Sequence, residues 1–368
     1  MKAAVDLSFI RPDHTNGGTE SCIKNLISGW TQQGVIDNFL FFIHDDIYTE
    51  YKNMFPQCQY KVYRCKGNHK MRTTWFQTFL LPVWVKAFEV DVLYYPTYTT
   101  GYYHKISVPV VVNPHDIQFK FYPDYFSVIK RIYLDLGYRH SLKKADRIIA
   151  ISDYVKNTLK EYYGTACGEK IQTIYDPVDF EQKYEEKLEL VKVPYILSIS
   201  SIAKHKNMLT LVRAFERICG EIPHQLVIVG CKGNGMEEIN AFLKERHLES
   251  RIYFTDYVKD GNVQWLHSHA DLYITTSLYE GFGMTPIEAM GRGIPTICST
   301  STSLPEVTKG MAKYYEPADD DRRLSETILS VLAKKNAGEY KVERDVFIEE
   351  YDKDRIAEKV YRLFEELI

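Results

Sequence analysis

The stretch that decides the fold is 271–300, DLYITTSLYEGFGMTPIEAMGRGIPTICST. It begins with one short apolar run, DLYITTS, and ends with another, PTICST, and both are typical of buried strands. Between them, Pro286 is suited to open a helix, and Gly291 and Gly293 are suited to close it. A strand, a helix and a second strand in this order predict a parallel sheet with a crossover helix.

The same alternation runs through the whole chain. Short apolar runs that predict buried strands are separated by helical segments such as 19–31, whose apolar residues recur on one face. The other strand-like runs are AAVDLSFI, VDVLYY, VPVVVN, DRIIAIS, PYILSIS, HQLVIVG and RIYFTDY. Ser152 follows DRIIAI and is a suitable N-cap for the next helix.

A chain of 368 residues predicts two domains. The stretch from about 174 to 194 breaks the alternation with two prolines and a charged middle, so we interpret it as the hinge. We therefore expect an α/β protein with two doubly wound, Rossmann-like parallel sheets, over 1–180 and 190–350, facing each other across a cleft. The final helix, about 354–368, has an apolar face that can pack back on the first domain.

Composition narrows the class of protein. Hydrophobic residues make up 45% of the chain and charged residues 26%, as in ordinary globular proteins. No run of about 18 apolar residues predicts a transmembrane helix, and the start, MKAAVDLSFIRPD, is typical of a first strand rather than a signal peptide. The seven cysteines are scattered without a C-x-x-C pair, which argues against a disulfide framework or a zinc site and for the cytoplasm.

Charge is uneven along the chain. Residues 1–180 carry 21 basic and 18 acidic side chains, and 51–88 carries seven basic side chains and no acidic one. This basic and aromatic stretch suits an anionic membrane surface, or it is a basic loop before a core helix. The small excess of positive charge and the absence of a recognised motif argue against nucleic-acid binding.

Two glutamates, Glu280 and Glu288, flank a Gly-Phe-Gly turn just after the strand DLYITTS. Carboxylates are strong acceptors for hydroxyl groups, and a nucleotide sugar carries hydroxyls on both its ribose and its hexose. The helix start between them favours an anion such as the diphosphate. As alternatives, Glu280 is simply solvated, or Glu288 forms a capping box with Thr285.

These motifs resemble the retaining GT-B glycosyltransferases of family GT4, which share the E-x7-E pattern. The resemblance covers nearly the whole chain and is closest to the mannosyltransferase-like branch that builds bacterial surface polysaccharides. The other stretches that carry it, in the family's order, are NPHDIQFKFYPDYF, KKADRIIAISDYVKNTLKEYYG, YILSISSIAKHKNMLTLVRAF, LVIVG, IYFTDYV and SLPEV.

The resemblance implies a donor site in the second domain and an acceptor site in the first. Glu280 would contact hydroxyls of the donor hexose, Glu288 would bind the ribose, and Lys206 would neutralise the diphosphate. Glycines allow the backbone to approach a ligand closely. The backbone that would line the sugar and diphosphate comprises Gly281, Phe282, Gly283, Met284 and Thr285. For Lys206, the alternative is an ordinary surface lysine at a helix start.

Ser201 stands where many family members carry an arginine, so one cation near the leaving group is missing. In the first domain, Gly17 and Gly18 precede a helix, as in the family, and form either an anion-binding turn or a plain turn. His115 aligns with a family histidine near the hexose, although a lone histidine is more often structural. By the same resemblance, the nucleobase of the donor would lie near Gly230, Lys232, Tyr257 and Val258.

The sequence thus predicts a hexosyltransferase that acts with retention on a glycan or lipid-linked glycan. Its donor would be a GDP- or UDP-hexose, first of all GDP-mannose, and no metal or other cofactor is expected because Lys206 can supply the charge. The enzyme would be cytoplasmic, with peripheral contact at the inner face of the membrane. A nucleotide-sugar epimerase and a non-catalytic donor-binding subunit are the alternatives.

Overall fold

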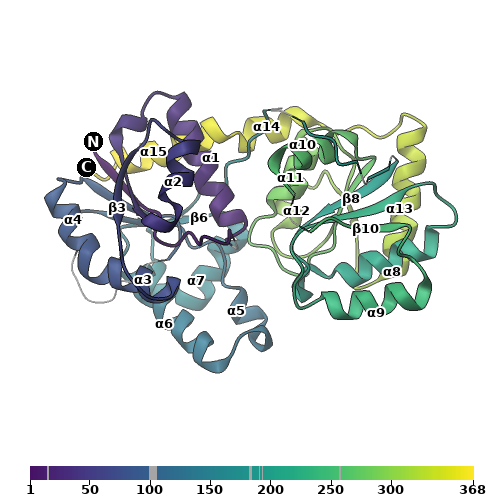
Figure 1. Cartoon of the computed structure of the whole chain (residues 1–368), viewed down its shortest axis with the longest axis horizontal. Coiled ribbons are helices and arrows are strands. Elements are labelled where there is room, and N and C mark those ends of the chain that lie inside the picture. Colours follow the sequence, from purple (N-terminus) through teal and green to yellow (C-terminus); the bar gives the residue numbers. More distant parts are fainter. Residues whose placement is uncertain (15, 99–105, 182–184, 190, 193, 257) are drawn as a thin grey trace. The chain divides into compact units, whose positions relative to one another are not determined.

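The computed structural model places the whole chain in two compact units (Figure 1). The first unit comprises Met1–Val178 and Tyr351–Ile368, and the second comprises Asp179–Glu350. The residues that the structure describes are 1–14, 16–98, 106–181, 185–189, 191–192, 194–256 and 258–368.

The first unit is built on a seven-stranded parallel sheet with the order β3-β2-β1-β4-β5-β6-β7. Its inner strands are apolar and almost fully buried, as expected for a sheet with helices on both faces. The strands are β1 (Ala3–Asp6), β2 (Phe39–His44), β3 (Gln59–Tyr63), β4 (Val92–Tyr95), β5 (Val110–Val112), β6 (Arg147–Ala150) and β7 (Ile171–Thr173).

Helices cover this sheet, and one of them comes from the far end of the chain. Helix α15 packs on α1, where the indole Nε1 of Trp30 donates to the carbonyl of Ala357 at 3.0 Å. Ser152 caps α7 by accepting from the backbone N–H of Val155 at 3.1 Å, which confirms the predicted N-cap. The helical segments are α1 (Gly18–Gln32), η1 (Ile36–Asn38), α2 (Asp45–Met54), α3 (His69–Trp75), η2 (Phe76–Leu80), α4 (Leu81–Ala87), α5 (Gln118–Phe121), η3 (Pro123–Tyr125), α6 (Val128–Lys144), α7 (Asp153–Cys167) and α15 (Lys353–Glu365).

The second unit repeats the plan with six parallel strands in the order β10-β9-β8-β11-β12-β13. Both units are therefore doubly wound α/β sheets, as the sequence predicted. The strands are β8 (Tyr195–Ile199), β9 (Gln225–Val229), β10 (Ile252–Phe254), β11 (Leu272–Thr275), β12 (Thr296–Ser299) and β13 (Lys313–Tyr315). The helical segments are η4 (Lys204–Lys206), α8 (Met208–Ile218), α9 (Met236–Arg246), α10 (Asp260–His269), α11 (Met284–Gly291), α12 (Leu304–Val307), α13 (Asp321–Asn336) and α14 (Arg344–Tyr351).

Strand order locates where each sheet can bind a ligand. In the second sheet the chain winds outward from β8 in one direction and from β11 in the other, so the crevice lies between the loops that follow these two strands. In the first sheet the same switch lies between β1 and β4. Among the described residues, no helix is both long and apolar enough to cross a bilayer.

Candidate active site

The loops after β8 and β11 bring Lys206 and Glu280 together at the switch point of the second sheet. The Nζ of Lys206 lies 2.6 Å from Oε1 of Glu280, although 74 residues separate them in the sequence. The hydroxyl of Ser277 donates to the same carboxylate oxygen at 2.7 Å. The side chains of Lys206 and Glu280 are only 16% and 18% exposed, so the charges are partly shielded from water.

The backbone of Glu280 is anchored by the loop after β12. The Oγ1 of Thr302 accepts from the N–H of Glu280 at 2.9 Å and donates to its carbonyl at 3.0 Å. The hydroxyl of Ser303, which is fully buried, bonds the carbonyls of Glu280 and Phe282. Thr302 adopts φ of +53°, which is uncommon for a β-branched residue, so this loop holds a strained conformation at the site.

Lys206 is held in place by hydrogen bonds to its own backbone and to that of its neighbours. The Oγ1 of Thr276 donates to the carbonyl of Lys206 at 2.9 Å, and the N–H of Leu278 donates to the carbonyl of His205 at 2.8 Å. Burial and the adjacent Lys206 charge lower the pKa of His205 to about 4, so this imidazole is neutral at physiological pH. Lys206 is therefore the cation that this loop presents beside Glu280.

Helix α11 begins two residues earlier than expected, at Met284 rather than Pro286. Its N-cap is Gly283, with φ of +102°, and a glycine has no side chain with which to cap. The capping box is therefore wrong: Thr285 lies inside the helix, where its hydroxyl accepts from Tyr273 at 2.7 Å. Gly291 ends the helix and Gly293 follows with φ of +82°, as predicted.

Glu288 consequently lies on the second turn of α11 rather than in a cap. Its backbone carbonyl accepts from Nη1 of Arg292 at 3.0 Å. Gly281 and Phe282 link Glu280 to the N-cap of α11, and the side chain of Phe282 is buried. Thus both carboxylates belong to one loop and helix start, as the sequence predicted, while a role for either in binding stays a prediction.

The loop after β9 lies against the loop after β8. A Cβ at Gly230, where φ is +144°, would lie 2.1 Å from the carbonyl oxygen of Ser200, so only glycine fits there. Ser201 is exposed. Lys232 pairs with Asp256 at 3.0 Å, but both side chains are more than half exposed, so this pair contributes little to stability.

Val258 is partly buried against the apolar cluster that includes Trp265. Tyr257, which was predicted to lie near the nucleobase of the donor, is outside the described residues.

In the first unit, Gly17 is the N-cap of α1. It adopts φ of +55° and ψ of −131°, a conformation that glycine alone reaches readily. A Cβ at Gly17 or Gly18 would meet no heavy atom of the described residues within 4 Å, so with respect to them the backbone is open to a close approach. The geometry is compatible with the predicted anion-binding turn. However, the side chain of Glu20 in the first turn is turned to His14 and Lys24, at 2.9 and 2.7 Å.

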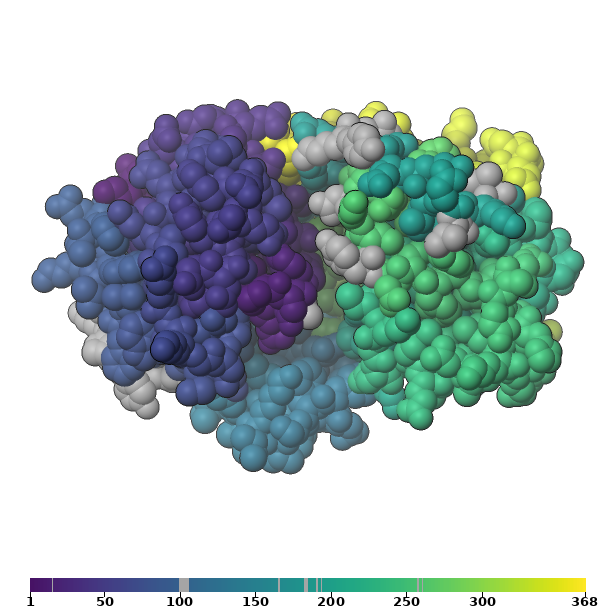
Figure 2. Space-filling view, viewed as in Figure 1, coloured from purple at the N-terminus to yellow at the C-terminus, as the bar shows by residue number. Residues whose placement is uncertain are grey.

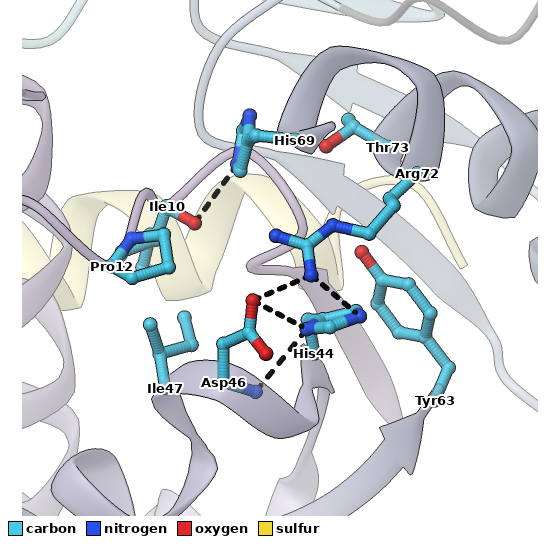
Figure 3. Close-up of a pocket in the computed structure, with 9 residues that line it drawn as sticks. All are labelled: Ile10, Pro12, His44, Asp46, Ile47, Tyr63, His69, Arg72 and Thr73. Carbon is cyan, nitrogen blue, oxygen red and sulfur yellow. Dashed lines mark hydrogen bonds and ion pairs between the residues drawn. The ribbon is translucent and has the colours of Figure 1, made fainter. Parts of the chain in front are cut away.

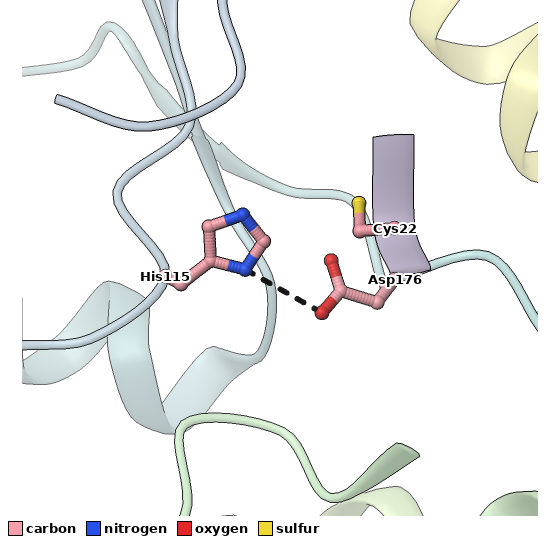
Figure 4. Close-up of side chains that lie close together, drawn as sticks. All are labelled: Cys22, His115 and Asp176. Atoms are coloured by element: carbon pink, nitrogen blue, oxygen red, sulfur yellow. Dashed lines mark ion pairs between the residues drawn. The ribbon is translucent and has the colours of Figure 1, made fainter. Parts of the chain in front are cut away.

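His115 lies in a buried cluster with Cys22 and Asp176 (Figure 4). Its Nε2 donates to the carbonyl of Pro96 at 3.0 Å, and its Nδ1 faces Oδ2 of Asp176 at 3.7 Å. Burial lowers the pKa of His115, but the charge and hydrogen bonding of Asp176, with smaller contributions from Pro96 and Asp116, raise it further, so the net shift is upward. The structure thus gives this histidine a structural environment and also a means of holding a proton.

Cys22, His115 and Asp176 are also residue types that bind metals, and their ligand atoms lie within 4.8 Å of one another. A cysteine binds a metal as its thiolate, and burial together with the charge of Asp176 raises the pKa of Cys22 well above its ordinary value. Without a cation beside it, this thiol is therefore protonated at neutral pH. Two other groups of potential ligands, His14 with Glu20 and Glu50, and His44 with Asp45 and Asp46, lie nearer the surface.

Sequence reasoning missed the hydroxyls that hold the Glu280 loop. Ser277, Thr302 and Ser303 follow β11 and β12 directly, so the rule that ligand loops follow parallel strands also pointed to them. Their residue types are common in loops of every kind, and the sequence alone showed no reason to single them out.

Two family models match the chain, one in each unit. The model described as "Glycosyltransferase Family 4" matches residues 16–182, and that described as "Glycosyl transferases group 1" matches residues 179–344. The chain belongs to glycosyltransferase family 4, group 1.

Curated relatives of this family member include two bacterial mannosyltransferases. The chain is 28% identical over 212 residues to the O-antigen chain mannosyltransferase RfbU of Salmonella typhimurium, covering 57% of each chain. It is 26% identical over 221 residues to the O-antigen chain mannosyltransferase B of Escherichia coli, covering 57% of this chain and 58% of the relative. The chain thus spans little more than half the length of these relatives.

Solved structures match along the whole chain. The HepE protein of Anabaena, solved in complex with UDP and glucose, superposes with a TM-score of 0.75 at 18% identity over 100% of both chains. A sucrose-phosphate synthase from Thermosynechococcus elongatus superposes with a TM-score of 0.80 at 17% identity, over 100% of this chain and 99% of the other. At such identities the likeness shows the fold, which is GT-B, as predicted.

Proposed function

We propose that this glycosyltransferase family 4 member transfers a hexose from a nucleotide sugar to a glycan acceptor, with retention at the anomeric carbon. The observation that carries the proposal is the ion pair between Lys206 and Glu280 at the switch point of the second sheet. A cation for a diphosphate and a carboxylate for sugar hydroxyls lie side by side where doubly wound sheets bind nucleotides.

Each residue has a separate part in the proposed reaction. Lys206 neutralises the negative charge that grows on the diphosphate as it leaves, which is the electrostatic contribution such a transfer needs most. Glu280 accepts hydrogen bonds from hexose hydroxyls, and Glu288 accepts them from the ribose. The backbone of 281–285 lines the sugar and the diphosphate at the start of α11, where the helix dipole favours an anion.

The ion pair between Lys206 and Glu280 allows each charged side chain to change its partner when the donor binds. In the protein without donor, each charge satisfies the other. When the donor enters, the diphosphate takes over the lysine and the hexose hydroxyls take over the carboxylate, so neither charge is left buried and unpaired. No metal is needed in this scheme, because the lysine carries the positive charge.

The finer assignments rest on the relatives and on composition. We propose mannose as the hexose and GDP as the nucleotide, because two relatives are named mannosyltransferases; UDP is the alternative, because HepE was solved with UDP. We further propose that the first unit binds the acceptor, that the acceptor is a lipid-linked glycan, and that the enzyme acts at the cytoplasmic face of the membrane. The assignments of Gly17 and Gly18 to donor binding and of His115 to a catalytic position near the hexose stay predictions.

The test is incubation of the protein with a panel of nucleotide sugars, with and without glycan acceptors. We expect slow release of free nucleoside diphosphate from one donor, faster release with acceptor, and a product whose anomeric configuration by NMR matches the donor's. A changed sugar still attached to its nucleotide would instead identify an epimerase. Binding of a donor with no turnover under any condition would identify a non-catalytic subunit.

A further inference from the structure

Three largely buried side chains of the first unit form a cluster of potential metal ligands. Cys22 lies on α1, His115 follows β5 and Asp176 follows β7, and the three side chains turn toward one another (Figure 4). Their sulfur, nitrogen and oxygen atoms lie within 4.8 Å of one another. The spacing of the cysteines argued against a zinc site, but spacing detects only ligands that are neighbours in the sequence.

The separations within this cluster suit one small ion. Zinc binds nitrogen or oxygen at about 2.0–2.2 Å and sulfur at about 2.3 Å, so two ligands of one tetrahedral ion lie about 3.3–3.7 Å apart. The Nδ1 of His115 lies 3.7 Å from Oδ2 of Asp176, which is too long for a hydrogen bond and at the upper end of this range. The other pairs need to close by little more than about 1 Å to satisfy the same geometry, which rotation of the side chains provides.

The ring of His115 is oriented as in metal-binding histidines. Its Nε2 donates to the carbonyl of Pro96 at 3.0 Å, and its Nδ1 faces Asp176. A histidine that binds a metal almost always donates its other ring N–H to a carbonyl, a carboxylate or a water, which fixes the orientation of the ring. An ion that takes the place of the proton on Nδ1 would therefore find this ring already in position.

One carboxylate oxygen of Asp176 is buried without a hydrogen-bond partner among the residues that the structure describes. This oxygen is Oδ1, and the residue is only 4% exposed. Figure 4 shows the carboxylate between the sulfur of Cys22 and the ring of His115. Because a buried charged oxygen without a partner is costly, a cation bound there would be stabilising.

Two other groups of potential ligands, those around His44 and Glu20, already contain a side-chain cation. The guanidinium of Arg72 binds Asp46 at 2.5 Å and lies 3.4 Å from Nε2 of His44 (Figure 3). The Nζ of Lys24 lies 2.7 Å from Glu20. A metal ion would have to displace these cations, whereas no lysine or arginine in the described part of the chain pairs with Asp176.

The ligand types select the metal. Thiolate and imidazole ligands favour zinc, whereas magnesium and calcium prefer oxygen ligands throughout. A Zn²⁺ ion with one thiolate, one carboxylate and one neutral imidazole has no net charge, which favours binding in a buried place.

Access to the cluster is through its histidine. Figure 2 shows the purple segment that contains α1 packed among the blue segments of the first unit. Cys22 is 1% exposed, whereas the side chain of His115 is 14% exposed. The histidine is therefore the ligand that an incoming ion meets first.

We propose that Cys22, His115 and Asp176 bind one Zn²⁺ ion through Sγ, Nδ1 and a carboxylate oxygen, with a water molecule as the fourth ligand. Binding forms a bond between zinc and the thiolate, and the thiol proton and any proton on Nδ1 pass to solvent. Because the ligands come from α1 and from the ends of β5 and β7, the ion joins three elements of the first unit and stabilises it.

Titration of metal-free, full-length protein with cobalt(II) and then with zinc tests the site without any measurement of transfer. Cobalt replaces zinc, and its absorption reports both a tetrahedral site and a thiolate ligand. We expect one ion per chain, a thiolate-to-cobalt charge-transfer band, and loss of this band when one equivalent of zinc is added. Magnesium should leave the band unchanged, because a thiolate binds it poorly.

Substitution of a ligand should remove these signals. Loss of a group that merely supports a ligand lowers metal affinity about ten- to a hundredfold, so Cys22→Ala should weaken zinc binding by at least about a hundredfold. Asp176→Asn keeps the shape of the side chain and should also weaken binding, and it decides the question if Cys22→Ala does not fold. Cys167→Ala is the matched control, because Cys167 is buried in the same unit, bonds the carbonyl of Leu159 and belongs to none of the described groups of potential ligands.

Thermal unfolding gives a second readout and shows which variants are folded. Zinc should raise the melting temperature of wild type and of Cys167→Ala by several degrees and leave that of both ligand variants unchanged. Wild type that binds no zinc at micromolar concentrations would overturn the proposal, as would folded ligand variants that bind zinc like wild type. Loss of the cobalt band in Cys231→Ala, which removes an exposed cysteine, would show adventitious binding at the surface and would also overturn it.

Discussion

Asp6 is a buried carboxyl at the end of β1, directly below the switch point of the first sheet. It accepts from the N–H of Ser8 at 2.9 Å and from Nε2 of Gln77 at 2.6 Å. Burial outweighs these hydrogen bonds and raises the pKa of Asp6 to about 6. The folded protein therefore holds a proton there over a pH range in which the unfolded chain has lost it.

The sign of the resulting pH dependence follows from this upward shift. The pKa of Asp6 rises from 3.8 to about 6, so the free energy of unfolding falls as the pH rises through this interval and stays lower above it. The loss amounts to about 3 kcal/mol. In Asp6→Asn this loss should vanish, so wild type should lose about 2.5 kcal/mol relative to the variant between pH 4 and pH 8, the remainder having been lost below pH 4.

Urea unfolding followed by tryptophan fluorescence at several pH values measures this difference. Three of the four tryptophans, Trp30, Trp75 and Trp84, lie in the first unit and report on it. A constant difference between wild type and Asp6→Asn at every pH would contradict the assignment.

For Glu288, the predicted contact with the ribose can be tested separately from a structural role in the helix. Because α11 is capped by Gly283 and not by a box with Thr285, Glu288→Ala should change the melting temperature of the donor-free protein little. Affinity for free nucleoside diphosphate should fall, by about ten- to a hundredfold if one charge-assisted hydrogen bond to the ribose is lost. Calorimetric titration measures that affinity. A sharp loss of stability with normal affinity would show that Glu288 supports the helix and would contradict the ribose contact.

At the scale of elements, the loops after β8 and β9 depend on one glycine. Gly230→Ala places a Cβ against the carbonyl of Ser200 and forces an alanine to φ of +144°, so it should destabilise the second unit by at least about 2 kcal/mol. Gly220→Ala is the matched control, since an added Cβ there would meet no atom within 4 Å in the part of the chain that the structure describes, and it should stay within about 1 kcal/mol of wild type. Equal melting temperatures for the two variants would refute the close approach.

The sequence predicted the elements that border the candidate site better than those at the sheet edges. PYILSIS and DLYITTS are bounded by turn residues and appear as β8 and β11. Strand β2 was missed because its six residues, FLFFIH, are all buried and show no alternation that distinguishes a strand from a buried helix.

Strands β3, β7 and β13 were missed for a different reason. They lie at the outer positions of their sheets and are partly exposed, and β7 and β13 are only three residues long. Such segments carry little apolar pattern, so their pairing is decided by the neighbouring strand. For the site, the strand-end rule placed Lys206 and Glu280 at one edge of the sheet, but their contact through Nζ and Oε1, and the hydroxyls that fix it, required coordinates.

At the scale of the whole molecule, the chain returns to its first unit at its end. Besides Ala357, four larger buried apolar residues of α15, Ile356, Val360, Leu363 and Phe364, cover α1, and the ring of Phe364 lies 6.4 Å from those of Trp30 and Phe39. Burying four such side chains contributes about 6–12 kcal/mol, which is comparable with the stability of a whole domain.

Deletion of 352–368 should therefore unfold the first unit and leave the second folded. Hydrogen exchange resolves the two: peptides from β1 to β6 should lose protection, and peptides from β8 to β12 should keep it. Deletion of 366–368 alone, a largely exposed tail, is the control and should change neither. Loss of protection in both units after the longer deletion would show that they do not fold independently.

The central claim is that Lys206 receives the donor diphosphate after release from Glu280. Its most direct test is calorimetric titration of a nucleoside diphosphate into wild type, Lys206→Met and Glu280→Gln, with donor turnover measured in parallel. Losing the lysine removes the charge-assisted contact to phosphate, so Lys206→Met should bind the nucleoside diphosphate about ten- to a hundredfold more weakly. Glu280→Gln keeps the shape and leaves the lysine to the ligand, so it should bind the nucleoside diphosphate at least as tightly as wild type while turnover falls by a similar factor. A folded Lys206→Met variant that binds the nucleoside diphosphate with wild-type affinity would contradict the account.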